Sequence, residues 1–277
     1  MTSIALACPH TPWVEERVSS FDRLKAQLAK SGQPDHYLEL TDKAPNEVWS
    51  VQMWKWMLDT GADFCLSLQD DVLAAPCFWP ALRAMITRLP PRAALGLSGV
   101  HPMAREQARK GHRWYCTTSW LIGWAWGMWR EDLELFYTWR MSQEGERTCQ
   151  AILPNGEDAL MNVWMNKTKR DCWHPVPSIV DHDVSIGSSY ANDNHGHRRP
   201  WITWHGYREV DLVRPDFWAP NGKRPTHYHT VAQNLCWWCN KRQPIKASQV
   251  TGAMMCGLCL HETMGSILSA FEGMGRR

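Results

Sequence analysis

The first part of the chain alternates between short apolar runs and segments with apolar residues at helical spacing. The run Ser3 to Cys8 predicts a first strand and Tyr37 to Leu40 a second. A helix is expected from about Val14 to Lys30, and another from Glu47 to Asp59 with Asn46 as its N-cap. The positions expected to face the core are Val18, Phe21, Leu24 and Leu28 in the first helix, and Val48, Val51, Trp54 and Leu58 in the second.

The same alternation continues to about residue 180. Strands are expected at Phe64 to Leu68, Ala94 to Val100 and Ser178 to Val180, and one or two more within Trp114 to Trp129. Helices are expected at Pro76 to Leu89, Glu131 to Met141 and Glu157 to Asn166, the last with Leu160, Val163 and Trp164 on its apolar face. In the Trp114 to Trp129 stretch, Gly123 and Gly127 permit close approach of backbone or ligand. Strands that alternate with helices predict an α/β layer fold with a largely parallel sheet.

Composition divides the chain into three parts. Residues 1–194 carry the strand and helix pattern, 195–233 form an irregular basic linker or wrapping segment, and 234–277 form a small cysteine-containing module with a C-terminal helix. From His195 onward there are 11 Lys and Arg against 5 Asp and Glu, whereas the first 194 residues carry 19 against 23. Affinity for polyanions is therefore expected in residues 195–277 and not in residues 1–194.

Two adjacent acids follow the third expected strand, in the segment Gln69-Asp70-Asp71. In an open α/β sheet ligands bind outside the carboxyl ends of the strands, so these carboxylates are placed to hold a cation and an anionic substrate. An isolated acidic pair is also typical of a solvated turn. Two later segments favour the functional interpretation: Glu157-Asp158 begins a helix, and His182 follows a strand.

In these three segments the chain resembles the GT-A glycosyltransferases, which use nucleotide sugars and have a Rossmann-like mixed sheet flanked by helices. FCLSLQDDV resembles the family's DxD strand, GEDALMNVW its later acidic helix start, and PSIVDHDVSIGSS its metal-ligating histidine segment. The resemblance implies that Asp71, with His182, holds Mn²⁺ or Mg²⁺, and that Gln69 and Asp70 contact the nucleotide. It implies that Asp158, or failing it Glu157, is the base of an inverting transfer. Gln69 departs from the family pattern, which often has an acid there.

The chemistry of transfer from a nucleotide sugar independently requires these residue types. A hard divalent cation on carboxylate oxygen neutralises the charge that develops on a diphosphate leaving group, and an imidazole ligand suits Mn²⁺ better than Mg²⁺. Structural explanations exist for each: acids favour a helix start through the dipole, and a lone histidine is commonly structural. Further candidates are an aromatic wall of Trp124, Trp126 and Trp129, with at least two of them expected in the core, and phosphate contacts by Ser185, Ser188 and Ser189.

The cysteines fall into two groups. Cys8, Cys65, Cys77, Cys116, Cys149 and Cys172 are scattered and are expected to be buried free thiols. Cys236-x2-Cys239 and Cys256-x2-Cys259, separated by sixteen residues, match the spacing of a zinc ribbon with one closed, structural Zn²⁺. Around them Trp237, Trp238, Lys241, Arg242 and Lys246 suit nucleic acid, or a ribbon docked on the main domain.

These features predict a cytoplasmic enzyme, because no signal peptide or membrane span is visible in the sequence. The first hypothesis is a glycosyltransferase that uses a nucleotide sugar, a UDP-sugar first. The chain resembles the sugar transferases with which bacteriophages modify bases in their own DNA, which implies a 5-hydroxymethylpyrimidine acceptor in duplex or locally opened DNA. The alternatives are a glycosyltransferase for a polysaccharide, lipopolysaccharide or protein, and a zinc-ribbon nucleic-acid-binding protein without catalysis.

Overall fold

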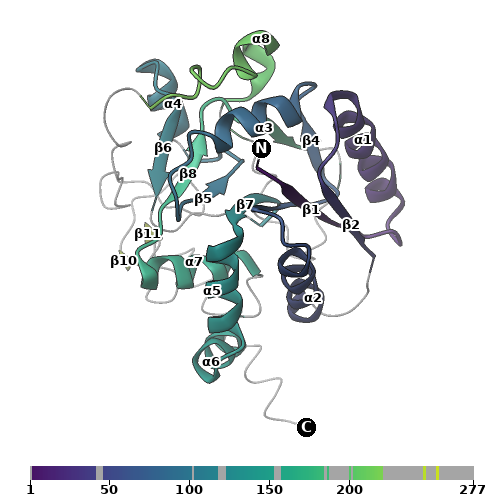
Figure 1. The fold of residues 1–277 in the computed structure, drawn as a ribbon, viewed down its shortest axis with the longest axis vertical. Coiled ribbons are helices and arrows are strands. Elements are labelled where there is room, and N and C mark those ends of the chain that lie inside the picture. Colours follow the sequence, from purple (N-terminus) through teal and green to yellow (C-terminus); the bar gives the residue numbers. More distant parts are fainter. Residues whose placement is uncertain are drawn as a thin grey trace.

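A mixed seven-stranded sheet forms the centre of the protein (Figure 1). The computed structural model describes residues 2–41, 46–101, 103–117, 123–152, 157–183, 186, 200 and 202–220, together with two short strands, β10 (Lys246–Ala247) and β11 (Met254–Met255). The sheet strands are β1 (Ile4–Pro9), β2 (His36–Leu40), β3 (Phe64–Leu68), β5 (Ala94–Gly96), β6 (Trp114–Thr117), β7 (Ala125–Trp129) and β8 (Cys172–Pro175). The α/β class predicted from the strand and helix alternation is confirmed.

The sheet is less parallel than the sequence pattern predicts. Its order is β2-β1-β3-β7-β5-β8-β6; the β1–β2, β1–β3 and β5–β8 pairs are parallel, and the pairs β3–β7, β5–β7 and β6–β8 are antiparallel. The stretch Trp114 to Trp129 is two strands, and the second of them enters the middle of the sheet in reverse. Because β3, β5 and β8 nevertheless run in one direction, their carboxyl ends meet at one edge of the sheet.

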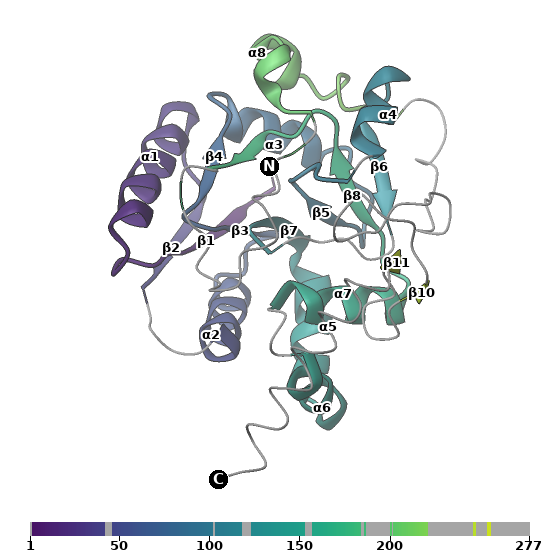
Figure 2. The same ribbon diagram turned by 180° about the vertical axis from the view of Figure 1, so that it is seen from behind.

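Each face of the sheet has its own hydrophobic core. On β1 and β3, Ile4, Leu6 and Leu66 belong to one core, and the alternating residues Ala7 and Cys65 belong to the other. Strand side chains alternate between faces, so consecutive apolar residues serve both cores. The first core is closed by α1 (Glu15–Ser31) and α3 (Phe78–Ile86), and the second by α2 (Asn46–Asp59), α5 (Arg130–Arg140) and α7 (Glu157–Thr168). Figures 1 and 2 show these two helical layers from opposite sides.

The buried faces of the first two helices agree with the prediction at Phe21, Leu24, Leu28 and Trp54 and differ from it at a few other positions. Val18 is 37% exposed and Val48 is 42% exposed, whereas Arg17 is buried in α1, and Met53 and Met57 are buried in α2. In α1 the reason is polar: Arg17 turns inward to meet two buried carboxylates. A rule that places only apolar residues inside a helix face cannot anticipate this.

Several elements were not predicted. The helices α4 (Met103–Arg109) and α6 (Gln143–Ile152) and the strand β8 carry weak apolar patterns. The strand expected at Ser178 to Val180 lies slightly later, as β9 (Val180–His182), where it pairs in antiparallel fashion with β4 (Val72–Ala74) to form a small second sheet. This second sheet connects the segment after β3 to a segment more than a hundred residues later.

Residues 202–220 pack on the α3 side of the sheet. They contain a 3₁₀ turn, η2 (Trp204–Gly206), and a short helix, α8 (Glu209–Leu212), and they bury Trp204, Leu212 and Trp218 in the first core. The Trp114 indole N–H donates to the Trp218 carbonyl at 2.6 Å. Within the described ranges, no helix is both long and apolar enough to cross a membrane.

Two smaller expectations are met in the described chain. The six scattered cysteines are buried and free, as predicted. Gly127 does permit a close approach: a Cβ there would lie 2.4 Å from Cε1 of Phe64, whose ring crosses the glycine from the neighbouring strand.

Gly96 should be intolerant of a side chain for the same reason. A Cβ at Gly96 would lie 2.4 Å from Cε1 and 2.6 Å from Nδ1 of His174, which is fully buried. Gly96→Ala should therefore destabilise the protein by about 1–3 kcal/mol, the usual cost of overpacking. Gly206→Ala, whose Cβ meets nothing within 4 Å, is the matched control in urea unfolding. Equal midpoints for the two variants would show that the core around His174 can relax.

Two buried histidines should make the fold acid-sensitive. Burial lowers the pKa of His174 to about 3 and that of His101 to about 4, from 6.5. Below pH 6.5 these two histidines bind protons in the unfolded chain but stay neutral in the folded chain. Stability should therefore fall as the pH drops from 6.5 towards 4, by up to about 1.4 kcal/mol per pH unit for each histidine.

The slope of unfolding free energy against pH measures this effect. His174→Gln should flatten the slope even though it removes the stack on Tyr115 (4.5 Å between ring centroids) and the 3.1 Å contact with Thr117 Oγ1. The same substitution at the exposed His205 is the control. An unchanged slope in His174→Gln would contradict the assignment.

Candidate functional site

The predicted acidic segment lies at the carboxyl edge of the sheet, where β3 ends. The Val72 N–H donates to the Gln69 carbonyl at 3.2 Å, so the chain turns sharply and Asp70 and Asp71 occupy the tip. Both side chains are buried, with Asp70 1% and Asp71 5% exposed. The solvated-turn alternative is therefore wrong, because buried carboxylates require partners.

Arg17, from the first turn of α1, supplies the main partner. Its guanidinium forms ion pairs with Asp70 Oδ1 and, at 3.1 Å, with Asp71 Oδ2. The Thr11 backbone N–H donates to the other Asp70 oxygen at 2.8 Å. The loop between β1 and α1 is thus fixed against the end of β3 by charge-assisted hydrogen bonds.

His182 reaches Asp71 from the small second sheet. Val72 pairs with His182 across β4 and β9, and the Asp183 N–H donates to the Asp71 carbonyl at 2.8 Å. This pairing leaves His182 Nε2 3.3 Å from Asp71 Oδ2. The two residues that the sequence resemblance assigns to a metal therefore lie in contact, although they are far apart in sequence.

The two carboxyls differ in electrostatics. Burial raises the pKa of Asp71, but the hydrogen bond and charge of His182, followed by the charge of Arg17, outweigh it and leave the pKa below its ordinary value. Burial raises the pKa of Asp70 above its ordinary value, and the Arg17 charge opposes this only in part. Asp71 is therefore the better anion of the pair.

Asp158 joins the same edge through the segment before β7. Its Oδ2 accepts the Gly123 N–H at 3.2 Å, and its Oδ1 accepts the Ala159 N–H at 2.9 Å. The next residue, Trp124, accepts the Gln69 N–H at 2.9 Å, and its ring centroid lies 5.2 Å from that of His182. The acidic turn, the start of α7 and His182 therefore each contact Gly123 or Trp124.

The residues present fit a divalent cation in part. Asp71 Oδ1 is buried and has no hydrogen-bond partner among the described residues, and His182 Nε2 is within reach of the same carboxylate. No group of three or more His, Cys, Asp or Glu side chains in the described ranges is arranged to hold a metal. A two-residue set is nevertheless what Mg²⁺-type sites use when substrate phosphates and water complete the sphere.

Sequence reasoning missed Arg17, Thr11 and His10. His10 stacks on Phe21 with ring centroids 4.2 Å apart, and both of its ring nitrogens are buried without a hydrogen-bond partner among the described residues. Burial lowers the pKa of His10. His10 and Thr11 follow β1 at the same edge of the sheet at which Asp70 follows β3. Their place at this common edge is the sequence signal that could have identified them.

The other residues predicted for the site either lie in the hydrophobic core or fall outside the described residues. Trp126 is fully buried, and Trp129 packs edge-on against Phe64 and donates to the Pro90 carbonyl at 3.1 Å. Trp124 is the member of the predicted aromatic wall that contacts His182. Outside the described residues lie the Glu157 side chain, Ser185, Ser188, Ser189, Trp237, Trp238, Lys241, Arg242 and the four cysteines of the expected zinc ribbon, Cys236, Cys239, Cys256 and Cys259. The short β10–β11 pair falls between the two cysteine pairs in sequence.

Comparison with known proteins gives no match, either to a protein-family model or to a curated protein.

The Arg17 pair should dominate the stability of this edge. Arg17→Met would leave two buried carboxylates without their cation, a change that typically costs about 3–5 kcal/mol. Arg214→Met, which removes the partner of Asp216 from an exposed ion pair, should leave the urea midpoint almost unchanged. If the two variants unfold at the same urea concentration, the buried pair does not hold the site together.

Proposed function

We propose that this chain is a metal-dependent glycosyltransferase that moves a sugar from a nucleotide sugar, a UDP-sugar first, to a hydroxyl acceptor. The best candidate acceptor is a 5-hydroxymethylpyrimidine in DNA. The observation that carries the proposal is the Asp71 carboxylate: it is buried, one of its oxygens has no partner among the described residues, and the other lies 3.3 Å from His182 Nε2.

The charge balance of the site supports a diphosphate substrate. When the His182 imidazole is neutral, the form that binds a metal, Asp70, Asp71 and Arg17 together carry one negative charge, which would repel a nucleotide diphosphate. Asp71 and His182 would hold Mn²⁺ or Mg²⁺, which when bound supplies positive charge at the diphosphate leaving group. With a divalent ion the net charge of the cluster becomes positive, so donor binding should depend on the metal.

The chain's own residues would orient the reactants. Asp70, fixed by Arg17 and the Thr11 N–H, holds the β1–α1 loop beside the acidic turn. Trp124 is buried in the first core and its ring packs beside His182, so it would fix the position of that imidazole. These groups place the donor at the carboxyl edge of the sheet, the usual ligand position in open α/β folds.

Asp158 is the proposed base. The N–H groups of Gly123 and Ala159 fix the orientation of its carboxylate. In an inverting transfer, a carboxylate oxygen takes the acceptor hydroxyl proton while the acceptor oxygen bonds to the anomeric carbon. The bond from that carbon to the diphosphate breaks, and its electrons leave with the diphosphate.

Asp71→Asn and His182→Gln should abolish the Mn²⁺-dependent thermal shift that a donor nucleotide sugar produces, and reduce sugar transfer by about 100-fold or more, the loss expected when a charge-stabilising group is removed. Asp63→Asn is the control, because Asp63 is an exposed acid at the other end of β3. The melting temperature without ligand shows whether each variant still folds.

Mass-labelled sugar and duplex DNA with 5-hydroxymethylpyrimidine test the acceptor. The donor class is wrong if no common nucleotide sugar shifts the wild-type melting temperature with Mn²⁺. Donor hydrolysis without transfer to this DNA would retain the enzyme class and reject the acceptor.

A further inference from the structure

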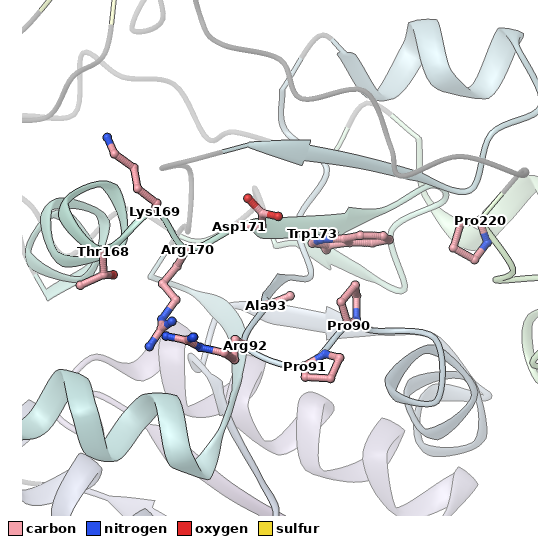
Figure 3. Close-up of a pocket in the computed structure, with 10 residues that line it drawn as sticks. All are labelled: Pro90, Pro91, Arg92, Ala93, Thr168, Lys169, Arg170, Asp171, Trp173 and Pro220. Carbon is pink, nitrogen blue, oxygen red and sulfur yellow. The ribbon is translucent and has the colours of Figure 1, made fainter.

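A pocket lies at the opposite edge of the sheet from Asp71. It has a volume of about 650 Å³ and is lined by Pro90, Pro91, Arg92, Ala93, Thr168, Lys169, Arg170, Asp171, Trp173 and Pro220 (Figure 3). Most of these residues lie just before β5 or between α7 and β8, whereas Thr168 is the last residue of α7, Trp173 is in β8 and Pro220 follows α8. Since β3, β5 and β8 are parallel, the pocket is separated from the acidic turn by the length of the strands.

Two basic residues that line the pocket have an uncommon backbone conformation. Arg92 has φ 64° and Lys169 has φ 55°, and among the described residues they are the only two non-glycine residues with positive φ. Both face this one pocket. Left-handed backbone favours glycine, so the local conformation explains neither the arginine nor the lysine.

The backbone around each residue is an ordinary turn. The Ala93 N–H donates to the Pro90 carbonyl at 3.2 Å, which with Pro91 second and Arg92 third is the pattern of a type II turn, where glycine is preferred at the third position. Lys169 ends α7, and the Arg170 N–H donates to the Met165 carbonyl at 2.9 Å in the manner of a Schellman motif, which also favours glycine. The backbone conformation therefore gives no reason for a charged side chain at either position.

The pocket also presents unused hydrogen-bond donors. The Trp173 indole N–H and the Arg170 Nε–H are buried and have no hydrogen-bond partner among the described residues. Arg170 pairs with Asp132 at 2.9 Å, and the charge of Arg92 also acts on the Asp132 carboxylate. Figure 3 shows the guanidinium groups of Arg92 and Arg170 turned towards each other. The Asp132 carboxylate interacts with both guanidinium groups and therefore neutralises one of their two positive charges.

The charge of the pocket matches a phosphodiester. Three cations, Arg92, Lys169 and Arg170, face two acids, Asp132 and Asp171, which leaves one net positive charge for a singly charged group. The prolines add apolar surface beside the cations, and Trp173, which is 2% exposed, closes the pocket from the core side. Pro220, which lines the pocket, leads directly into residues 221–277, where seven Lys and Arg stand against two Asp and Glu.

We infer that this pocket binds a phosphate group of a nucleic-acid strand, held by Arg92, Lys169 and the Trp173 indole N–H. The inference extends the DNA acceptor of the proposed function. It does not rest on sugar transfer, because strand binding is measurable without a donor. The residues that bind here are distinct from those at the carboxyl edge.

The test compares full-length wild-type protein with the double variant Arg92→Gly/Lys169→Gly. Glycine removes both charges and suits both left-handed positions, so the variant should melt no lower than wild type. It should bind a fluorescent oligothymidylate at least about fivefold more weakly, and the slope of log K against log salt should decrease by about 0.7, the value for one lost phosphate contact on a single strand. Trp173→Phe should weaken binding as well.

Lys30→Gln/Arg147→Gln removes the same charge elsewhere on the surface and should bind like wild type. Should the glycine variant melt lower, Arg92→Gln/Lys169→Gln supplies the same comparison. Calorimetry with inorganic phosphate separates the two phosphate sources: saturable binding that the double variant loses, without an effect on the oligonucleotide, assigns the pocket to free phosphate and overturns the nucleic-acid assignment.

Equal oligonucleotide affinity of the double variant and the surface control would overturn the inference, as would the absence of wild-type binding to the strand. Asp71→Asn should leave strand binding unchanged. Failure of sugar transfer therefore reports on the proposed function and failure of strand binding reports on this pocket.

Discussion

Two adjacent carboxylates are buried at the end of β3, and the architecture of the carboxyl edge follows from the need to neutralise them. A buried carboxylate without a partner is very costly, so Asp70 and Asp71 require a cation and hydrogen-bond donors. Arg17 and the Thr11 N–H come from the chain between β1 and α1, and His182 comes from β9. One electrostatic requirement therefore connects three segments that are far apart in sequence.

The same requirement explains why a buried pair can still serve a ligand. If folding alone were at stake, apolar residues would fill this turn at no electrostatic cost, since buried ion pairs are weak contributors to stability. Arg17 satisfies most of Asp70 and one oxygen of Asp71, but the other oxygen of Asp71 is unpartnered among the described residues. The cluster is thus incomplete at one defined atom. An incomplete buried cluster with a histidine beside it is expected where a ligand finishes the coordination.

The sequence predicts what depends on local pattern and fails where distant partners decide. The strands β1, β2 and β3 and the helices between them follow from apolar spacing, and Asp70-Asp71 follows from its place after a strand. Arg17 could not be found this way, because an arginine in the first helical turn looks like a solvent-exposed residue until its buried partners are known. The strand β8 escaped prediction because His174 and Pro175 interrupt its apolar run, although His174 is buried in a stack on Tyr115.

The two edges of the sheet carry opposite charge, and helix α7 alone accounts for part of this contrast. Acids at its start and basic residues at its end, such as Asp158 and Lys169, both complement the helix dipole. The helix dipole does not explain the positive charge of Arg92, because Arg92 lies in a turn before β5 and in no helix. Arg92 also occupies a left-handed position, where glycine would be easier to accommodate. Lys169 alone would be explained by charge compensation at a helix end. Arg92 is therefore the residue that favours a ligand pocket over that explanation.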